Sequence, residues 1–153
     1  MKVSTKARYA VMAMVDLATH GKDHPVSLPE IALRQELPLP YLEQLFNKLK
    51  KTSLVKSSRG SAGGYLLNHP AQEIRILDVI HAVDRPVKTT RCENHSPKGC
   101  QNSGMRCLTH DLWEELGAVI HLFLAKVTLA DICDRRVLGL GRFSFQAFEE
   151  ARK

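Results

Sequence analysis

Three cysteines and a histidine lie close together in the second half of the sequence, in a stretch with little apolar character. Seven residues separate Cys92 from Cys100, six separate Cys100 from Cys107, and two separate Cys107 from His110. Cys107 and His110 lie three positions apart at the expected start of a helix, so both side chains can face one point while the loop brings the other two thiols to it. Thiolates and imidazole are ligands of zinc and of iron–sulfur clusters. The sequence therefore predicts a metal site on these four residues.

The spacing alone does not choose the metal. A structural zinc site more often has close ligand pairs on both sides, which the long gaps here lack. Four reduced thiols without any metal are the plain alternative. His95 lies in the same loop and is the rival of His110 as a ligand. Cys133 lies farther along the chain in a short apolar segment, where we expect it to be a small buried hydrophobic residue.

Length and composition are those of a small folded domain with an appendage. The chain has 153 residues, of which 44% are apolar, enough for one core and some oligomer surface. The apolar run 11–15 is too short to span a membrane, is followed by Asp16 and has no signal-peptide cleavage site. We therefore expect a cytoplasmic protein, where disulfides are rare, with no membrane partner. The sequence has no nucleophile motif or phosphate-binding loop, so we do not expect an enzyme.

The first part of the chain predicts two helices with clear start signals. Ser4 or Thr5 can cap a helix whose apolar residues recur at steps of three and four, and Gly21 can end it. Ser27 and Glu30 form a capping box at the start of a short second helix.

A third helix and a hairpin are predicted next. Pro38 and Pro40 should break the chain, so that helix resumes over 41–51. Residues 54–59 and 65–67 predict two strands joined by a glycine-rich turn. Two helices, a tight turn, a third helix and a basic hairpin are typical of a winged helix-turn-helix.

The rest of the chain predicts a helix over 76–83, a long loop and a second long helix from about 109 to 126. A loop of that length without apolar periodicity usually has a functional reason. Thr128 can cap a last short helix. The expected fold class is mainly α with a small β-hairpin wing. Our predicted organisation is a DNA-binding domain (1–84), a connector with the cysteine loop (85–108), a dimerisation helix with the short final helix (109–134) and a loosely held tail (135–153).

Charge favours a polyanionic partner. The net charge is +6, and residues 1–60 hold ten Lys and Arg against five Asp and Glu. Such a basic region attracts nucleic acid, although a solvated lysine-rich face is the alternative. On the predicted third helix, Gln44 and Glu43 are the best candidates for base contact, because Gln can pair with adenine and Glu with the cytosine amino group.

The remaining predicted DNA contacts position the protein on the duplex. Arg59, at the edge of the wing, could enter a narrow minor groove. Candidates for phosphate contact and for the rest of the recognition surface are Lys6, Arg8, Tyr9, Tyr41, Asn47, Lys48 and Lys51.

The long helix after His110 is apolar around most of its circumference, which predicts a partner helix from a second copy. A buried helix within one domain is the alternative. A twofold dimer would place two recognition helices about one turn of DNA apart on a near-palindromic double-stranded operator. The predicted dimer contacts are Leu116, Val119, Ile120, Phe123, Leu124 and Val127.

Several stretches are similar to those of a known family, the winged-helix regulators of iron–sulfur cluster assembly. The similarity covers residues 1 to about 133, and it is strongest in 6–10, 41–46, 59–67 and 107–113. It implies a [2Fe–2S] cluster on Cys92, Cys100, Cys107 and His110, loaded by the iron–sulfur assembly machinery, whose occupancy controls promoter choice.

The sequence departs from that family in two places. The gaps between the first three cysteines are slightly longer, which costs a flexible loop little closure entropy. Pro38 and Pro40 replace expected serines, which removes hydroxyls that could bind phosphate and leaves operator preference open. Within the same fold, a zinc site or a response to iron, nitric oxide or cysteine supply remains an alternative, as does an electron-transfer protein that does not bind DNA.

Overall fold

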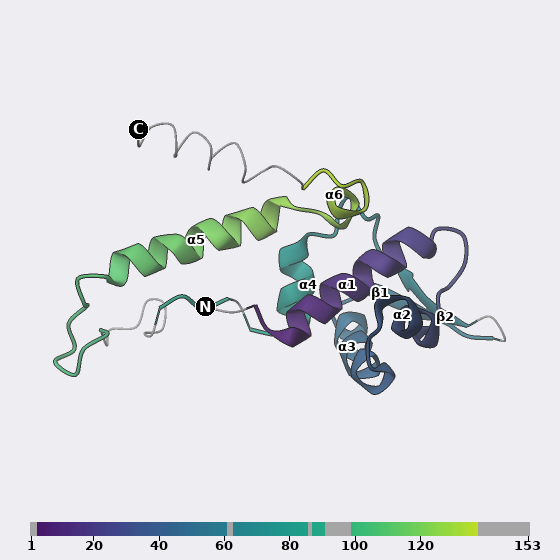
Figure 1. Cartoon of the computed structure of the whole chain (residues 1–153), viewed down its shortest axis with the longest axis horizontal. Helices are drawn as coiled ribbons and strands as arrows, with labels where there is room; N and C mark the ends of the chain where they lie inside the picture. Colours follow the sequence, from purple (N-terminus) through teal and green to yellow (C-terminus); the bar gives the residue numbers. More distant parts are fainter. Residues whose placement is uncertain (1–2, 61–62, 86, 91–98, 138–153) are drawn as a thin grey trace.

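Six helices and one antiparallel hairpin form the part of the chain that the structure describes. This computed structural model describes residues 3–60, 63–85, 87–90 and 99–137. Cys92, His95, the tip of the predicted wing and most of the predicted tail lie outside these residues. The elements (Figure 1) are α1 (Thr5–His20), α2 (Leu28–Gln35), α3 (Leu39–Lys51), β1 (Val55–Ser58), β2 (Gly64–Leu67), α4 (Ile76–Val83), α5 (His110–Lys126) and α6 (Leu129–Cys133).

The predicted starts of the first two helices are confirmed. The Ser4 hydroxyl accepts a hydrogen bond from the Ala7 amide at 3.1 Å, and Gly21 is the C-cap of α1. At the start of α2, the Ser27 amide donates to Glu30 at 2.8 Å and the Glu30 amide donates to the Ser27 hydroxyl at 3.4 Å. These caps bind amides that have no partner inside the helix.

The third helix begins two residues earlier than predicted, at Leu39. Pro38 precedes it as the extended N-cap, as predicted, but Pro40 lies in its first turn, so the prediction that Pro40 also precedes the helix was wrong. A proline in the first turn loses no hydrogen bond, because the first amides of a helix have no partner within it, and its fixed φ suits the helix. The break after α2 lies instead at Glu36, whose φ of 53° is in the left-handed region.

The wing is fastened to the body by the loop between α1 and α2. Strands β1 and β2 pair with Val55 opposite Leu67 and Ser58 opposite Gly64. Val26 exchanges two backbone hydrogen bonds with Tyr65, at 3.0 and 2.8 Å. A Cβ on Gly64 would lie 2.5 Å from the Val26 carbonyl oxygen, so the close approach requires glycine here.

A segment from the end of the described chain closes the core. The Ile76 amide donates to the Val127 carbonyl and the Leu129 amide to the Ile74 carbonyl, both at 2.9 Å. Val127 is only 6% exposed, so its predicted role at a dimer surface was wrong: the chain turns back at this residue into its own core. Thr128 then caps α6 as predicted, in a capping box with Asp131.

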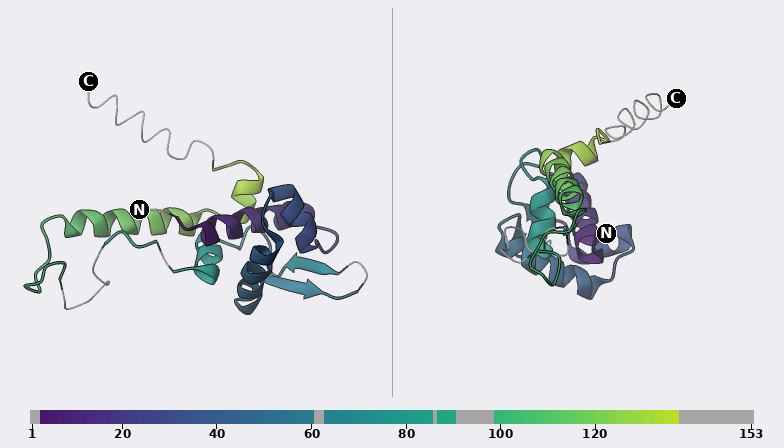
Figure 2. Two further views of the ribbon diagram at one scale, coloured as in Figure 1. Left: turned by 60° about the horizontal axis from the view of Figure 1, so that its bottom comes forward. Right: turned by 90° about the vertical axis from the view of Figure 1, so that its left-hand side faces the viewer.

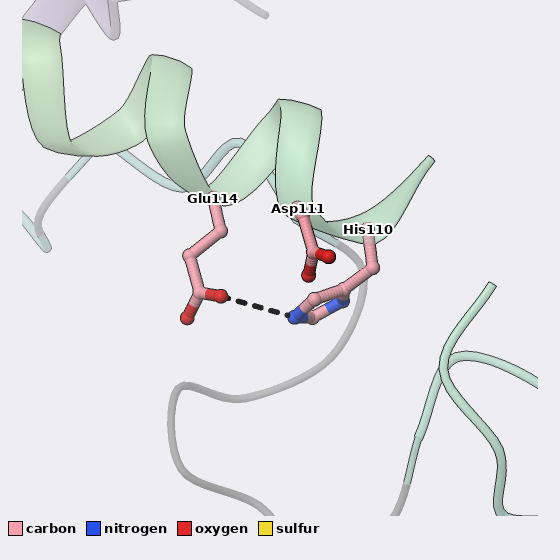
Figure 3. Close-up of side chains that lie close together, drawn as sticks. All are labelled: His110, Asp111 and Glu114. Atoms are coloured by element: carbon pink, nitrogen blue, oxygen red, sulfur yellow. Dashed lines mark ion pairs between the residues drawn. The ribbon is translucent and has the colours of Figure 1, made fainter. Parts of the chain in front are cut away.

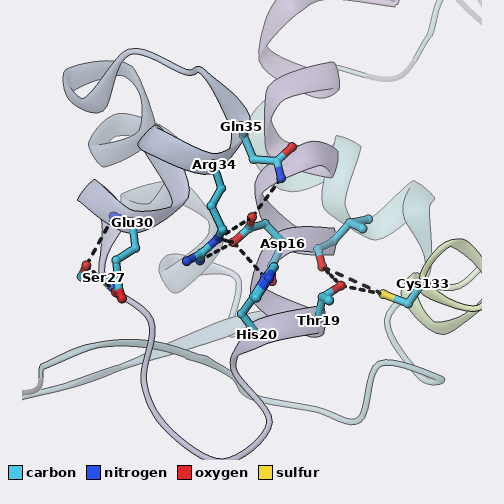
Figure 4. A network of polar contacts seen from close by, with 9 residues as sticks. Asp16, Thr19, His20, Ser27, Glu30, Arg34, Gln35 and Cys133 are labelled. Carbon is cyan, nitrogen blue, oxygen red and sulfur yellow. Dashed lines mark hydrogen bonds and ion pairs between the residues drawn. The ribbon is translucent and has the colours of Figure 1, made fainter.

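Helices α1 and α2 are held together by a buried carboxylate (Figure 4). The Asp16 side chain is 0% exposed and accepts hydrogen bonds from Arg34 at 2.7, 3.0 and 3.2 Å and from Gln35 at 2.9 Å. Burial raises the pKa of Asp16, but the hydrogen bonds from Arg34 and Gln35 and the nearby charges of Arg34 and His20 outweigh burial and hold that pKa below the ordinary value of an aspartate. From the sequence, Asp16 was only the residue that ends an apolar run.

Helix α5 extends away from the winged domain as an arm, and the wing points in the opposite direction (Figures 1 and 2). The connector lies against this arm: the Thr89 hydroxyl donates to the Trp113 carbonyl at 2.6 Å. A Cβ on Gly117 would lie 2.5 Å from the Thr89 hydroxyl oxygen, so a glycine on α5 leaves room for the connector.

Among the described helices, none has the length and apolar character needed to cross a bilayer.

Candidate metal centre and DNA-binding surface

Three of the four predicted metal ligands lie in the described residues, and they face one cavity. The Cys100 Sγ atom lies 3.1 Å from His110 Nδ1. Both residues and Cys107 line a cavity of about 620 Å³ whose wall includes Thr89, Thr90, Gln101, Thr109 and Trp113. Two ligands at a tetrahedral metal are about 3.5 Å apart. Cys100 and His110 are therefore close enough to bind one metal centre, and Cys107 lines the same cavity.

The loop and the start of α5 position these donors. A turn around Cys100 is held by backbone hydrogen bonds from Gly99 to Gly104 at 3.0 Å and from Gln101 to Met105 at 3.1 Å. The His110 amide donates to the Cys107 carbonyl at 3.0 Å, which places the two ligands on one turn, as their spacing predicted. The Cys107 Sγ atom lies 3.5 Å from the Thr109 hydroxyl.

Two carboxylates that the sequence analysis missed lie beside His110 (Figure 3). His110 Nε2 is 3.4 Å from Glu114 Oε2, and ligand atoms of His110, Asp111 and Glu114 all lie within 4.8 Å of one another. His110 is 6% exposed. The signal was available in the sequence, because residues four apart on a helix share a face.

Cys133 belongs to a different part of the molecule. Its Sγ atom lies 3.6 Å from the Thr19 hydroxyl oxygen and 3.9 Å from the Val15 carbonyl (Figure 4), and the side chain packs against the core. This contact supports its expected role as a small hydrophobic residue.

Helix α3 has the amphipathic character predicted for a recognition helix. Its buried residues are Leu42, Leu45, Phe46 and Leu49. Its other face is exposed and carries Glu43, Gln44, Asn47 and Lys51. Lys50, which the sequence analysis did not select, donates to the Ser57 hydroxyl at 2.8 Å and joins α3 to the wing. Tyr9 and Tyr41 pack edge to face with ring centroids 5.7 Å apart, so they also orient α3 on α1.

A basic groove lies where α1, α3 and α4 meet. It has a volume of about 430 Å³, and Lys6, Lys48, Lys51 and Arg85 line it. Arg85 was predicted only as part of the connector. Lys48 also has a structural bond, since its Nζ donates to the Val83 carbonyl at 2.9 Å. A hydrogen bond from the Ser4 hydroxyl, with help from the Arg85 amide and the charges of Lys6 and Lys48, lowers the pKa of Asp84, the acid in this groove.

The arm α5 divides the remaining predicted dimer residues into two groups. Val119 and Phe123 are exposed, as are Leu112 and Leu122, which were not among the predicted contacts. Ile120 and Leu124 instead face α4 across a small cavity. Leu112, Leu116, Val119 and Phe123 follow the spacing of an apolar seam along the arm.

A helix-turn-helix with an exposed polar recognition face, a following wing and a basic groove beside it defines a winged-helix DNA-binding regulator. The comparisons agree. The model of the Rrf2 family, described as "Iron-dependent Transcriptional regulator", matches residues 3–135. The chain belongs to the Rrf2 family and is a DNA-binding transcriptional regulator.

Individual relatives carry two kinds of name. The chain is 48% identical over 136 residues to the HTH-type transcriptional regulator IscR of Yersinia pseudotuberculosis, covering 89% of this chain and 81% of the relative. It is similar to the solved T. potens IscR (TM-score 0.71, 40% identity, 89% and 88% of the two chains). It is also similar to CymR of B. subtilis, titled a global cysteine regulator (TM-score 0.74, 32% identity, 88% and 98%). The fold is therefore shared by regulators with different names, one of which is titled a cysteine regulator.

Proposed function

We propose that this chain senses iron–sulfur cluster status through a [2Fe–2S] cluster on Cys92, Cys100, Cys107 and His110 and controls the genes of cluster assembly. The observation that carries the proposal is the 3.1 Å approach of Cys100 Sγ to His110 Nδ1 beside a cavity that Cys107 also lines. The similarity to proteins named IscR supports the choice of cluster. We place the protein in the cytoplasm, with the assembly machinery as cluster donor.

The chain's own residues would make loading reversible. When bound, the cluster supplies a group whose presence depends on iron and sulfide supply. Cys100 and Cys107 would hold it as thiolates, which bind iron strongly. His110 would be the weaker fourth ligand, because a neutral imidazole binds less tightly than a thiolate and can be lost to a proton.

Contacts between helices offer a route from this site to DNA. Helix α5 starts at His110 and packs on the C-terminal end of α4. There the rings of His81 on α4 and His121 on α5 have centroids 6.0 Å apart. The last turn of α4 presents the Val83 carbonyl that Lys48 of the recognition helix binds. We propose that cluster loading shifts α5 on α4 and thereby the pose of α3.

Anaerobic purification of the full chain tests the cluster. We expect visible absorption with iron and sulfide in equal amounts, lost in Cys100→Ser and kept in the matched variant Cys133→Ser, whose thiol packs on α1. A colourless protein that contains zinc would favour the second candidate, a zinc-stabilised regulator. A metal-free protein with four reactive thiols would contradict both.

We propose that the exposed face of α3 reads a near-palindromic operator. Gln44→Ala should reduce discrimination between the cognate operator and operators with changed bases. Lys51→Ala should weaken binding to all sequences and reduce the slope of log affinity against log salt by about 1. Binding titrations over a salt series distinguish the two effects, and identical behaviour of the two variants would contradict the assignment.

We propose that the exposed seam on α5 pairs with the same seam of a second copy. Its support is a seam of apolar side chains at heptad-like spacing on a helix that extends away from its own core; Leu112, Val119 and Phe123 are exposed and Leu116 is half-buried. Sedimentation should show a dimer at micromolar concentration, and a monomer there would contradict the proposal.

A further inference from the structure

We propose that Glu114 is a positioning residue that fixes which nitrogen of His110 binds the metal. In this arrangement Nδ1 is the ligand atom, and Nε2 carries the proton and faces the Glu114 carboxylate. This inference rests on the proposed metal site but not on whether the metal is zinc or an iron–sulfur cluster.

The two ring nitrogens of His110 face chemically different partners. Nδ1 lies 3.1 Å from the Cys100 thiol, whereas Nε2 lies 3.4 Å from Glu114 Oε2 (Figure 3). A neutral imidazole has one N–H and one lone pair, and a carboxylate accepts hydrogen bonds but donates none. The carboxylate therefore favours the proton on Nε2, which leaves the lone pair of Nδ1 directed to the side of the cysteine thiol.

The helix makes this arrangement persistent. His110 and Glu114 are four residues apart on α5, so backbone hydrogen bonding holds both side chains on one face. Glu114 is also within 3.8 Å of Arg106, a more distant and exposed contact to the same oxygen. Among the residues that the structure describes, Asp111 is a rival acceptor, since its carboxylate belongs to the same cluster.

A carboxylate behind a metal-bound histidine fixes the ring and makes it a better ligand. Loss of such a partner typically costs 10- to 100-fold in metal affinity. We therefore expect Glu114→Gln, which keeps shape and removes charge, to release the metal at least 10-fold faster. Glu115→Gln is the matched control, because it makes the same chemical change at the next, exposed position of the helix.

The first measurement needs no cluster. Long-range ¹H–¹⁵N NMR on the metal-free full chain with labelled histidine, with His110 assigned from His110→Gln, reports the tautomer. We expect the proton on Nε2 in the wild type and in Glu115→Gln, and a mixture of tautomers in Glu114→Gln. A proton on Nδ1 in the wild type would overturn the proposal.

The second measurement uses the reconstituted protein. Pulsed EPR of the reduced cluster should show strong coupling to ¹⁵N placed at Nδ1, and transfer of iron to a chelator should be at least 10-fold faster in Glu114→Gln than in Glu115→Gln. Equal rates, or a faster loss in Asp111→Asn than in Glu114→Gln, would overturn the role of Glu114. If no variant loads a cluster, the proposed function fails, while cobalt(II) titration of the metal-free chain still compares the variants.

Discussion

The winged domain and the arm each contain a buried ionisable side chain with an oppositely charged or polar partner, Asp16 in the domain and His110 in the arm, but the two sites are built differently. In the domain, the Asp16 carboxylate of α1 accepts hydrogen bonds from two side chains of α2, Arg34 and Gln35. In the arm, His110 is similarly buried, yet it faces a thiol and a carboxylate that is 42% exposed, next to a cavity of about 620 Å³. The first cluster needs nothing further to be stable. The second site places metal-binding atoms on the wall of a cavity that can hold a ligand, as a binding site requires.

The largest expected effect removes the partner of the enclosed carboxylate. Arg34→Ala leaves the Asp16 charge buried with Gln35 and His20 only, and should lower the free energy of unfolding by about 3 kcal/mol. Its counterpart in the arm is Arg106→Ala, which removes a 3.8 Å pair whose side chains are 55% and 42% exposed. That change should cost less than about 0.5 kcal/mol. Urea denaturation of both variants measures the two losses in free energy of unfolding, and equal losses would contradict the difference between the two regions.

Acid should weaken the domain through Asp16. Because the pKa of this carboxyl is lower in the folded protein than the ordinary pKa of an aspartate, the folded state binds fewer protons than the unfolded chain. The stabilisation is present above the pKa of the unfolded carboxyl and is lost as pH falls from there through the folded pKa. Asp16→Asn should therefore be less stable than wild type at pH 6, and the gap should narrow below pH 4. Thermal unfolding of both proteins across this range measures it; a gap independent of pH would show that Asp16 acts through packing alone.

The two regions also differ in how far the sequence predicts them. Local signals sufficed in the domain: Ser4, Ser27 and Thr128 each cap the helix that they were predicted to cap. Errors arose where a distant segment decides the outcome. Val127 has the same apolar character whether it faces a partner or its own core, and only the backbone pairing with Ile76 distinguishes the two.

At the metal site, residue types and spacing predicted which ligands lie close together, but not which residue contacts the second nitrogen of His110. Cys100 and His110 are ten residues apart, so their approach depends on how the loop between them closes, which donor chemistry and spacing do not specify. Glu114 is not a typical ligand beside cysteines, so donor type does not single it out, although its position four residues after His110 places it on the same helix face. The pairing of Asp16 with Arg34 needs two helices to pack, which no local pattern specifies.

The smallest expected effect is that of Gly117→Ala on the arm, and the same substitution at Gly64 in the wing is its comparison. In Gly64→Ala the new methyl group meets the backbone oxygen of Val26 at 2.5 Å. This backbone is hydrogen-bonded on both sides and cannot move aside, so we expect the free energy of unfolding to fall by about 1–3 kcal/mol.

In Gly117→Ala the new methyl group meets the Thr89 hydroxyl, also at 2.5 Å. This hydroxyl can rotate away and give up its hydrogen bond to the Trp113 carbonyl. That lost bond, about 1 kcal/mol, is offset by the higher helix propensity of alanine, also about 1 kcal/mol. Gly117→Ala should thus leave the unfolding free energy nearly unchanged while altering the fluorescence of Trp113, the single tryptophan of the chain. A large loss of stability in Gly117→Ala would show that the connector is held as firmly as the wing.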